Sequence, residues 1–437
     1  MHSALPKQAD MLMALPIRGE SFLLRRSGKH VLVDGGYKGD KIARVLENQI
    51  QDVPFLDVVV CTHGDSDHVG GLPPLLKEWS GRIGQMWLPG RWVNVAPQLV
   101  VDPAEFFKQL ICELDVELKE PSEDVTSIIR EIEGATGQWD VWKDTDVSSS
   151  DHDTRPIDEW VYGTDLPFDK IEKKQEPEWF DKLRRSDLVS SETASSAVAS
   201  ARRKARYRLN KGTSGMNVRI AEYWLGLIET AEAIRKVAIE AIEQKIPTRW
   251  FDFEGFSLTR CAKGGVPGFF IPVNAVEQAT PPTVLAKFLQ LTKINRESLV
   301  FLAPPMKERL GVLFCADSPL GDGPNFGNSF LRPLPFPNSW FPIVATAPHH
   351  GSESNKAAYN HLRNWMDVAV LLRAGGSTKQ PGATFLGQRD CLRLCTKCPR
   401  AGHAPLLSGV VLNRSKWPPR QLWHLPLLIA IGRRCVC

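Results

Sequence analysis

The sequence predicts an α/β fold in which two β-sheets pack together beneath outer helices, with a helical insertion between the sheet-forming segments. Three observations predict it: β-rich runs before residue 100, helical periodicity after it, and a return of β character from residue 248. We expect a first half-domain at 1–100, a mainly helical insertion at 101–247, a second half-domain with a Cys-rich segment at 248–410, and a C-terminal tail at 411–437.

The first segment has the pattern of a β-hairpin followed by a β-α-β unit. Residues 21–25 and 30–34 are short β runs around the turn at 27–29, and residues 41–50 have helical spacing. Residues 56–61 form a β-branched run long enough for one buried strand. The strand therefore leads directly into Thr62.

The insertion is acidic from residue 102 to about 169, where periodic patches such as 106–118 predict helices joined by exposed loops. Residues 217–245 predict a long amphipathic helix that Pro247 ends. Its apolar stripe comprises Ile220, Trp224, Leu227, Ile228, Ala231, Ile234, Ala238 and Ile242.

In the second segment, β runs recur between glycines and prolines. They lie at 248–253, 269–272, 298–302, 311–315 and 341–346.

Bulk composition excludes some classes of protein. A chain of 437 residues with 43% apolar residues can bury a large core, and its 54 basic and 50 acidic residues give a net charge of only +4. Any nucleic-acid surface must therefore be local. No uncharged apolar run approaches the roughly 20 residues of a membrane helix, so we expect no membrane partner. The first residues lack a secretory pattern, which predicts a cytoplasmic protein, and nine unevenly spaced cysteines are not a disulfide framework.

The strongest chemical signal is the loop at 62–71. His63, Asp65, Asp67 and His68 place two imidazoles and two carboxylates within six positions, directly after the predicted buried strand. Carboxylates so close repel each other unless a cation neutralises them, so the pattern predicts a metal site. A polar surface loop is the alternative, which the alternating spacing after an apolar strand makes the weaker interpretation.

Further ligand types follow other predicted strands. Asp317 comes after the run at 311–315, and His349 with His350 after the run at 341–346. Strand ends deliver side chains to a common rim, so these residues are expected to join the loop at 62–71. An ordinary turn aspartate and a non-functional histidine pair are the alternatives.

The segment 63–68 resembles the metallo-β-lactamase superfamily signature His-x-His-x-Asp-His, with Asp65 in place of the second histidine. An aspartate there, with Gly-Gly following, is similar to the soluble domain of bacterial competence (DNA-uptake) proteins. Residues 295–300, 314–317 and 347–352 resemble that subgroup's Asn-x-x-Ser-Leu-Val strand, metal-bridging aspartate and Pro-His-His-Gly-Ser. The resemblance implies a four-layer αββα sandwich of the metallo-β-lactamase type, with residues 1–100 and 248–410 as its halves.

The resemblance also implies roles for these residues. His63 and Asp65 would hold one divalent ion and Asp67 and His68 a second, with Asp317 bridging. One residue of the pair at 349–350 would complete the ligand set, and the other would donate to developing negative charge. We assign His350 to the metal and His349 to catalysis, although the sequence leaves them interchangeable.

Supporting roles follow from the same comparison. Asp67 would also orient the water that a divalent ion activates, and Asp34, in Asp-Gly-Gly, would hydrogen-bond a ligand. A turn-forming role for Asp34 is equally compatible with the sequence. The superfamily's separate middle histidine has no counterpart, since His152, expected at the surface, is the only histidine between His68 and His349. One or two ions are therefore expected, and an oxygen-rich ligand set admits manganese as well as zinc.

These residues predict a metal-dependent hydrolase, foremost a phosphodiesterase or nuclease. A hydrolase of a small ester, lactone or phosphorylated metabolite is one alternative. A non-catalytic or partner-activated component of a multi-protein bacterial system, docking through the insertion or the C-terminal segment, is another. A basic run predicts contact with a nucleic-acid backbone. The alternative is an ordinary solvent-exposed face of a helix. Its cations are Arg202, Arg203, Lys204, Arg206, Arg208 and Lys211.

A second metal site is predicted near the end of the chain. Cys391, Cys395, Cys398 and His403 have spacings near those of structural zinc ligands. Free cytosolic thiols are the alternative.

Overall fold

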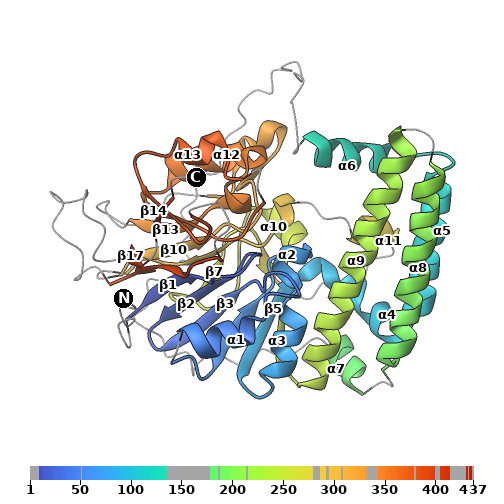
Figure 1. Ribbon diagram of the computed structural model, residues 1–437, viewed down its shortest axis with the longest axis horizontal. Helices are drawn as coiled ribbons and strands as arrows, with labels where there is room; N and C mark the ends of the chain where they lie inside the picture. Colours follow the sequence, from blue (N-terminus) through green and yellow to red (C-terminus); the bar gives the residue numbers. More distant parts are fainter. Residues whose placement is uncertain are drawn as a thin grey trace.

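The computed structural model describes most of the chain. The described residues are 9–50, 52–134, 178–185, 188–212, 215–278, 286–291, 295–306, 309–331, 342–377, 380–398, 404–413, 430–431 and 433–435. Within them, two sheets lie face to face between layers of helices (Figure 1). The four-layer αββα sandwich expected from the sequence is thereby confirmed.

The first sheet has nine strands among the described residues, in the order β17-β16-β1-β2-β3-β4-β5-β6-β8. Their bounds are β1 (Met11–Ala14), β2 (Phe22–Arg26), β3 (Lys29–Val33), β4 (Leu56–Val60), β5 (Ile83–Pro89), β6 (Thr248–Asp252), β8 (Val276–Glu277), β16 (Ser408–Val411) and β17 (Ala430–Ile431). Strands β3 to β6 run parallel, so their carboxyl ends meet at one edge.

The second sheet has the order β18-β15-β14-β13-β10-β9-β7. Its strands are β7 (Ile271–Pro272), β9 (Phe301–Ala303), β10 (Gly311–Phe314), β13 (Ile343–Thr346), β14 (Val368–Arg373), β15 (Leu392–Cys395) and β18 (Arg433–Arg434). Strands β10, β13, β14 and β15 are parallel, and they too share a carboxyl edge. A separate pair joins β11 (Gly321–Asp322) to β12 (Asn328–Ser329).

Helices cover both outer faces of the sandwich (Figure 1). Before the insertion lie α1 (Ile42–Val45), the π-helix η1 (Leu46–Ile50), α2 (Ser66–Val69), α3 (Leu72–Glu78), the 3₁₀ turn η2 (Gly90–Asn94) and α4 (Ala96–Val101). The insertion contains α5 (Pro103–Glu117), α6 (Glu123–Gly134), α7 (Glu178–Arg184), α8 (Ser191–Lys211) and α9 (Gly215–Glu243). After it come α10 (Phe253–Thr259), α11 (Lys287–Leu291), α12 (Lys356–Trp365), α13 (Ala383–Leu386) and the short 3₁₀ turns η4 (Asn295–Glu297), η5 (Pro324–Phe326), η6 (Pro348–Gly351) and η7 (Glu353–Asn355).

Side chains alternate between three apolar layers because successive residues of a strand point to opposite faces. In β3, Val31 and Val33 join the core between the sheets, whereas Leu32 faces the helices of the first sheet. In β10, Val312 lies between the sheets and Leu313 packs towards α12 and α13. Both sheets are therefore buried on both faces.

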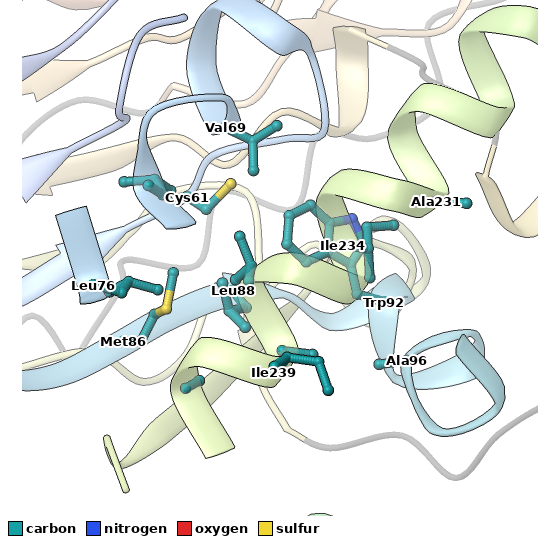
Figure 2. Close-up of a cluster of buried hydrophobic side chains, with 14 of the residues drawn as sticks. Cys61, Val69, Leu76, Met86, Leu88, Trp92, Ala96, Ala231, Ile234 and Ile239 are labelled. Carbon is teal, nitrogen blue, oxygen red and sulfur yellow. The ribbon is translucent and has the colours of Figure 1, made fainter. Parts of the chain in front are cut away.

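The helical insertion separates two strands that are hydrogen-bonded neighbours, β5 and β6. All eight residues of the predicted stripe on α9 are buried, which confirms that prediction. Figure 2 shows Ile234 and Ile239 of α9 in the same buried cluster as Met86 and Leu88 of β5. The insertion is thus anchored on the first sheet through α9, and α8 packs in turn on α5 and α9.

The described part of the predicted C-terminal tail belongs to the sandwich. Strand β17 pairs with β16 in the first sheet, and β18 pairs with β15 in the second. The end of the chain therefore contributes one short strand to each sheet. Among the described residues, no helix is both long and apolar enough to cross a membrane.

We predict that replacing Trp224 by alanine lowers the free energy of unfolding by about 3–5 kcal/mol, the cost of emptying a buried aromatic site. Trp224 is fully buried, and its Nε1 donates to the Leu110 carbonyl oxygen at 2.9 Å, which ties α9 to α5. Chemical denaturation would measure the loss. The control is Val116→Ala on the exposed side of α5, expected to change stability by less than about 0.5 kcal/mol. Equal effects of the two variants would contradict this account.

Candidate metal centre

The predicted ligands meet where the carboxyl edges of the two sheets face each other. His63, Asp65, Asp67 and His68 follow β4 in the first sheet. Asp317 follows β10, and the pair at 349–350 lies in η6, directly after β13, in the second sheet. The fold therefore brings together residues more than 280 positions apart, such as Asp67 and His350, as the strand-end argument predicted.

Glycines allow the two loops of the first sheet to touch. Gly35 donates its N–H to the His68 carbonyl oxygen at 2.5 Å, and Gly71 donates to the Gly36 carbonyl oxygen at 2.9 Å. A Cβ on Gly71 would lie 2.1 Å from the Gly35 carbonyl oxygen, so no larger residue fits there. This close approach places Asp34 beside His68.

The Asp317 carboxylate lies at the centre, with each oxygen facing a different set of histidines. Its Oδ2 lies 3.6 Å from His63 Nε2 and 3.5 Å from His349 Nε2. Its Oδ1 lies 3.2 Å from His68 Nε2 and 4.0 Å from His350 Nε2. A carboxylate with partners on both sides can bridge two ions.

The motif aspartates lie on opposite sides of this arrangement. Asp65 Oδ2 is 3.8 Å from His63 Nε2, and Asp67 Oδ2 is 3.1 Å from His350 Nε2. The first group is thus His63, Asp65 and Asp317, whose ligand atoms all lie within 4.8 Å of one another. On the second side Asp67 joins His350.

The side chains fit a divalent cation. Two ligand atoms bound at about 2.1 Å to a tetrahedral ion lie about 3.4 Å apart, close to the separations around Asp317. His63 Nε2, His68 Nε2 and Asp317 Oδ1 are buried, and each lacks a hydrogen-bond partner among the described residues. Buried polar atoms are normally paired, so these three are suited to metal coordination.

Hydrogen bonds to the far side of three rings leave their Nε2 atoms free to bind metal. His68 Nδ1 lies 2.8 Å from Asp34 Oδ2, and His350 Nδ1 lies 3.0 Å from the Ala374 carbonyl oxygen. His63 Nδ1 lies 3.0 Å from the Thr62 hydroxyl, which itself donates to Asp34. Each Nδ1 therefore faces an acceptor, which favours the tautomer with its proton on Nδ1.

His349 has the opposite environment. Its Nδ1 lies 3.4 Å from the amide nitrogen of Asn295, which can only donate, and 3.4 Å from the Ser354 hydroxyl. A donor at Nδ1 favours the tautomer with its proton on Nε2, the atom that faces Asp317. His349 is also the more exposed of the two neighbouring histidines. These contacts suit a donor to substrate better than a metal ligand.

Within the cluster, the carboxylates favour protonated imidazoles and the imidazoles favour ionised carboxylates. Burial lowers the pKa of His350, but Glu20 and a hydrogen bond with Asp67 raise it to about 10. Burial likewise opposes ionisation of Asp317, yet His349 and His68 lower the pKa of its carboxyl well below the usual range. Protons on the imidazoles thus balance the carboxylates, and a divalent ion would replace those protons.

The sequence prediction missed Glu20. Its Oε2 lies 3.0 Å from His350 Nδ1, and the residue is buried in the loop before β2. Glu20 could join a ligand group with His68, Asp317 and His350. It contacts Nδ1, however, so we assign it to orienting His350. A lone glutamate ahead of a strand carries no sequence signal for this role.

A pocket opens beside His63. Its walls include residues 89–92 and, from α9 of the insertion, Thr230 and Ile234. Three carboxyl-bearing residues, Asp252, Glu254 and Glu297, also line it. Arg91 is the arginine of the lining and pairs with Glu297 at 2.8 Å. The charge of the walls is therefore mainly negative.

The predicted basic run lies on α8, which packs on α5 and α9; in Figure 1, α9 lies between α8 and the sheets. Arg202 pairs with Glu232, and Arg208 pairs with Asp115. Arg203, Lys204, Arg206 and Lys211 are exposed. None of the six lines the pocket beside His63, so their contact with nucleic acid stays a prediction.

The predicted zinc ligands are only partly brought together. Cys395 and Cys398 lie in one group of thiols with Cys435, which the sequence prediction did not include. Cys391 is half-buried outside that group. His403 and His152 lie outside the described residues.

Comparisons with known proteins agree with the fold and the motif. Residues 16–102 match the family model of the metallo-beta-lactamase superfamily. Over 68 residues the chain is 35% identical to proteins named Exodeoxyribonuclease WalJ from two strains of Streptococcus pneumoniae, D39 and R6. The matched part is 16% of this chain and 25% of each relative, so the chain spans a quarter of their length. The two-sheet fold of the described residues is the αββα sandwich of the metallo-β-lactamase type, and residues 16–102 carry the sequence similarity to that superfamily.

We predict that Asp34→Asn weakens metal binding by about 10–100-fold, because the carboxylate that holds the proton of His68 on Nδ1 is lost. Calorimetric titration with Zn²⁺ and with Mn²⁺ would measure the change. Asp57→Asn is the matched control. Asp57 is also buried, lies in β4, and accepts a hydrogen bond from the backbone N–H of His30, away from the cluster. Unchanged affinity in Asp34→Asn would exclude the role assigned to Asp34.

Proposed function

We propose that this protein is a metal-dependent hydrolase that cleaves phosphodiester bonds, as a nuclease or related phosphodiesterase. One or two divalent ions, zinc or manganese, would be held by His63, Asp65, Asp67, His68, Asp317 and His350. The observation that carries the proposal is the Asp317 carboxylate, whose two oxygens face separate sets of imidazoles at 3.2–4.0 Å.

A divalent ion at this place supplies an activated water and neutralises charge on the substrate. Asp67 is suited to orient that water, because its contact with His350 helps to hold the pKa of its carboxyl below the usual range despite burial. His349, with a proton on Nε2, would donate to the oxygen on which negative charge develops. Asp34, Thr62 and Glu20 would keep the ligand rings in place.

The choice of a phosphodiester rests on two points. The relatives that match the chain are named exodeoxyribonucleases. In addition, a bridging carboxylate between two ligand groups is suited to paired ions, which can stabilise both the attacking and the leaving oxygen of a phosphodiester.

The second candidate is hydrolysis of a small ester, lactone or phosphorylated metabolite. The pocket beside His63 favours it, since carboxylates of Asp252, Glu254 and Glu297 would repel a long polyanion. Arg91, already paired with Glu297, offers limited compensation. The two candidate functions use the same metal centre. They differ in whether the pocket beside His63 accepts a long polyanion or only a small substrate.

We predict that the purified chain, supplied with Mn²⁺ or Zn²⁺, cleaves at least one of single-stranded DNA, duplex DNA, RNA or bis(p-nitrophenyl) phosphate. Asp67→Ala and His68→Ala should reduce the rate at least about 100-fold, because each removes a metal-binding group, whereas Asp57→Asn should not. Gel and absorbance assays would measure cleavage. Metal-loaded protein that leaves every phosphodiester intact but hydrolyses small esters, lactones or phosphomonoesters would replace the first candidate by the second. If none of these substrates is cleaved, both fail.

A further prediction separates the neighbouring histidines. His350→Ala should lower bound metal, since His350 presents a free Nε2, whereas His349→Ala should keep the metal and lose about 10²–10³-fold in turnover, as expected for loss of a donor to developing charge. Elemental analysis and rates measured on the same samples give the comparison. Loss of metal in His349→Ala would show that His349 is a ligand instead.

A further inference from the structure

Three buried thiols lie at the carboxyl edge of the second sheet, apart from the candidate metal centre. Cys395 ends β15, Cys398 follows in a Cys-x-x-Cys turn, and Cys435 follows β18, which pairs with β15. Their sulfur atoms all lie within 4.8 Å of one another, and each residue is at most 3% exposed. The pairing of β15 with β18 thus closes a thiol cluster from segments 37 residues apart.

The sulfur geometry matches a tetrahedral thiolate site. Two sulfurs bound to zinc at about 2.3 Å lie about 3.8 Å apart, and Cys398 Sγ is 3.6 Å from Cys435 Sγ. A disulfide would need sulfurs at about 2.05 Å. The cluster therefore has the spacing of metal ligands without a covalent bond between them.

The surroundings of Cys395 favour a thiolate. Arg373 Nη1 donates to its sulfur at 3.0 Å, and the N–H of Lys397 donates at 3.2 Å. Hydrogen bonds of this kind orient and stabilise a sulfur ligand.

We propose that Cys395, Cys398 and Cys435 bind a structural zinc ion that fastens the C-terminal strand β18 to β15. On binding, each thiol releases its proton to solvent and the sulfur donates an electron pair to Zn²⁺, with no change of oxidation state. Of the set expected from sequence spacing, this one keeps Cys395 and Cys398 and takes Cys435 in place of Cys391, which lies outside the cluster. His403 lies outside the described residues.

The fold gives a reason for such an ion. Strand β18 has two residues, paired with β15 through Leu394–Arg434 and Cys395–Arg433. The Cys435 N–H adds a hydrogen bond to the Arg393 carbonyl oxygen at 2.8 Å. So short an edge strand has little stability of its own. An ion bound by Cys395 and Cys398 on one side and by Cys435 on the other would hold β18 in register with β15.

The same ion would also fix the position of Arg373, which contacts the backbone of His350 in the candidate metal centre. Arg373, at the end of β14, donates from Nη1 to Cys395 and from Nε to the His350 carbonyl oxygen at 2.6 Å. His350 has a left-handed backbone, with φ of 53°, which needs support from its surroundings. Arg373 is therefore a positioning residue between the thiol cluster and His350.

The test uses the full chain, first stripped of metal with a chelator under reducing conditions and then titrated with Co²⁺. Sulfur-to-cobalt charge-transfer absorption reports thiolate ligands, whereas Co²⁺ at the His/Asp centre does not produce it. We expect one equivalent of ion with this absorption in the unsubstituted chain and in His68→Ala. The absorption should disappear in Cys395→Ser, Cys398→Ser and Cys435→Ser.

Cys391→Ser and Cys112→Ser are the matched controls, and both should keep the absorption. If the unsubstituted chain shows no sulfur-to-cobalt absorption, the proposal is overturned, and this result does not depend on whether any variant folds. Its loss in Cys391→Ser would overturn the ligand assignment. Mass spectrometry of the unreduced chain adds an independent outcome: a Cys398–Cys435 disulfide in place of bound zinc would also overturn it. Failure of hydrolysis in the assays above would leave this proposal unaffected, because the thiols form a separate cluster.

Discussion

Mutual repulsion among buried carboxylates is the constraint on which the centre of this protein depends. The carboxylates of Asp34, Asp317 and Glu20 are buried beside a few imidazoles, and those of Asp65 and Asp67 lie half-buried around the same rings. Such a group is stable only when cations accompany it, either protons on the rings or metal ions between the side chains. The raised pKa values of His68 and His350 and the buried atoms left without hydrogen bonds both follow from this one requirement.

The sandwich meets this requirement by bringing two parallel sets of strand ends together. Strands β3 and β4 present Asp34 and the motif loop, while β10 and β13 present Asp317 and the histidine pair. Because each sheet is buried on both faces, these edges are held by two apolar cores and cannot separate to relieve repulsion. The insertion adds α9, whose Thr230 side chain contacts the motif loop at Gly64 and limits the pocket on that side.

Sequence patterns predicted those features that are local in the chain. The stripe on α9 and the strands leading to Thr62, Asp317 and His349 follow from periodicity and β-branched runs, so the fold class and the ligand candidates could be read in advance. Strands β1, β5, β14, β15 and β16 were among those missed, because short apolar runs are ambiguous by periodicity alone. Contacts of residues outside any recognisable motif could not be predicted: neither Glu20 beside His350 nor Cys435 beside Cys395 is indicated by local spacing.

The order of the parallel strands in the second sheet also explains why two chemically different clusters adjoin one edge. Strand β13 delivers imidazoles, β15 delivers thiols, and β14 between them ends in Arg373. Imidazole and carboxylate suit ions that exchange water, whereas thiolates hold zinc in a closed site. One strand separates the thiols from the imidazole–carboxylate centre, and Arg373 at the end of that strand contacts both groups. The same sheet edge thus carries the buried thiol cluster at β15 and, one strand away, the imidazole–carboxylate centre beside the pocket.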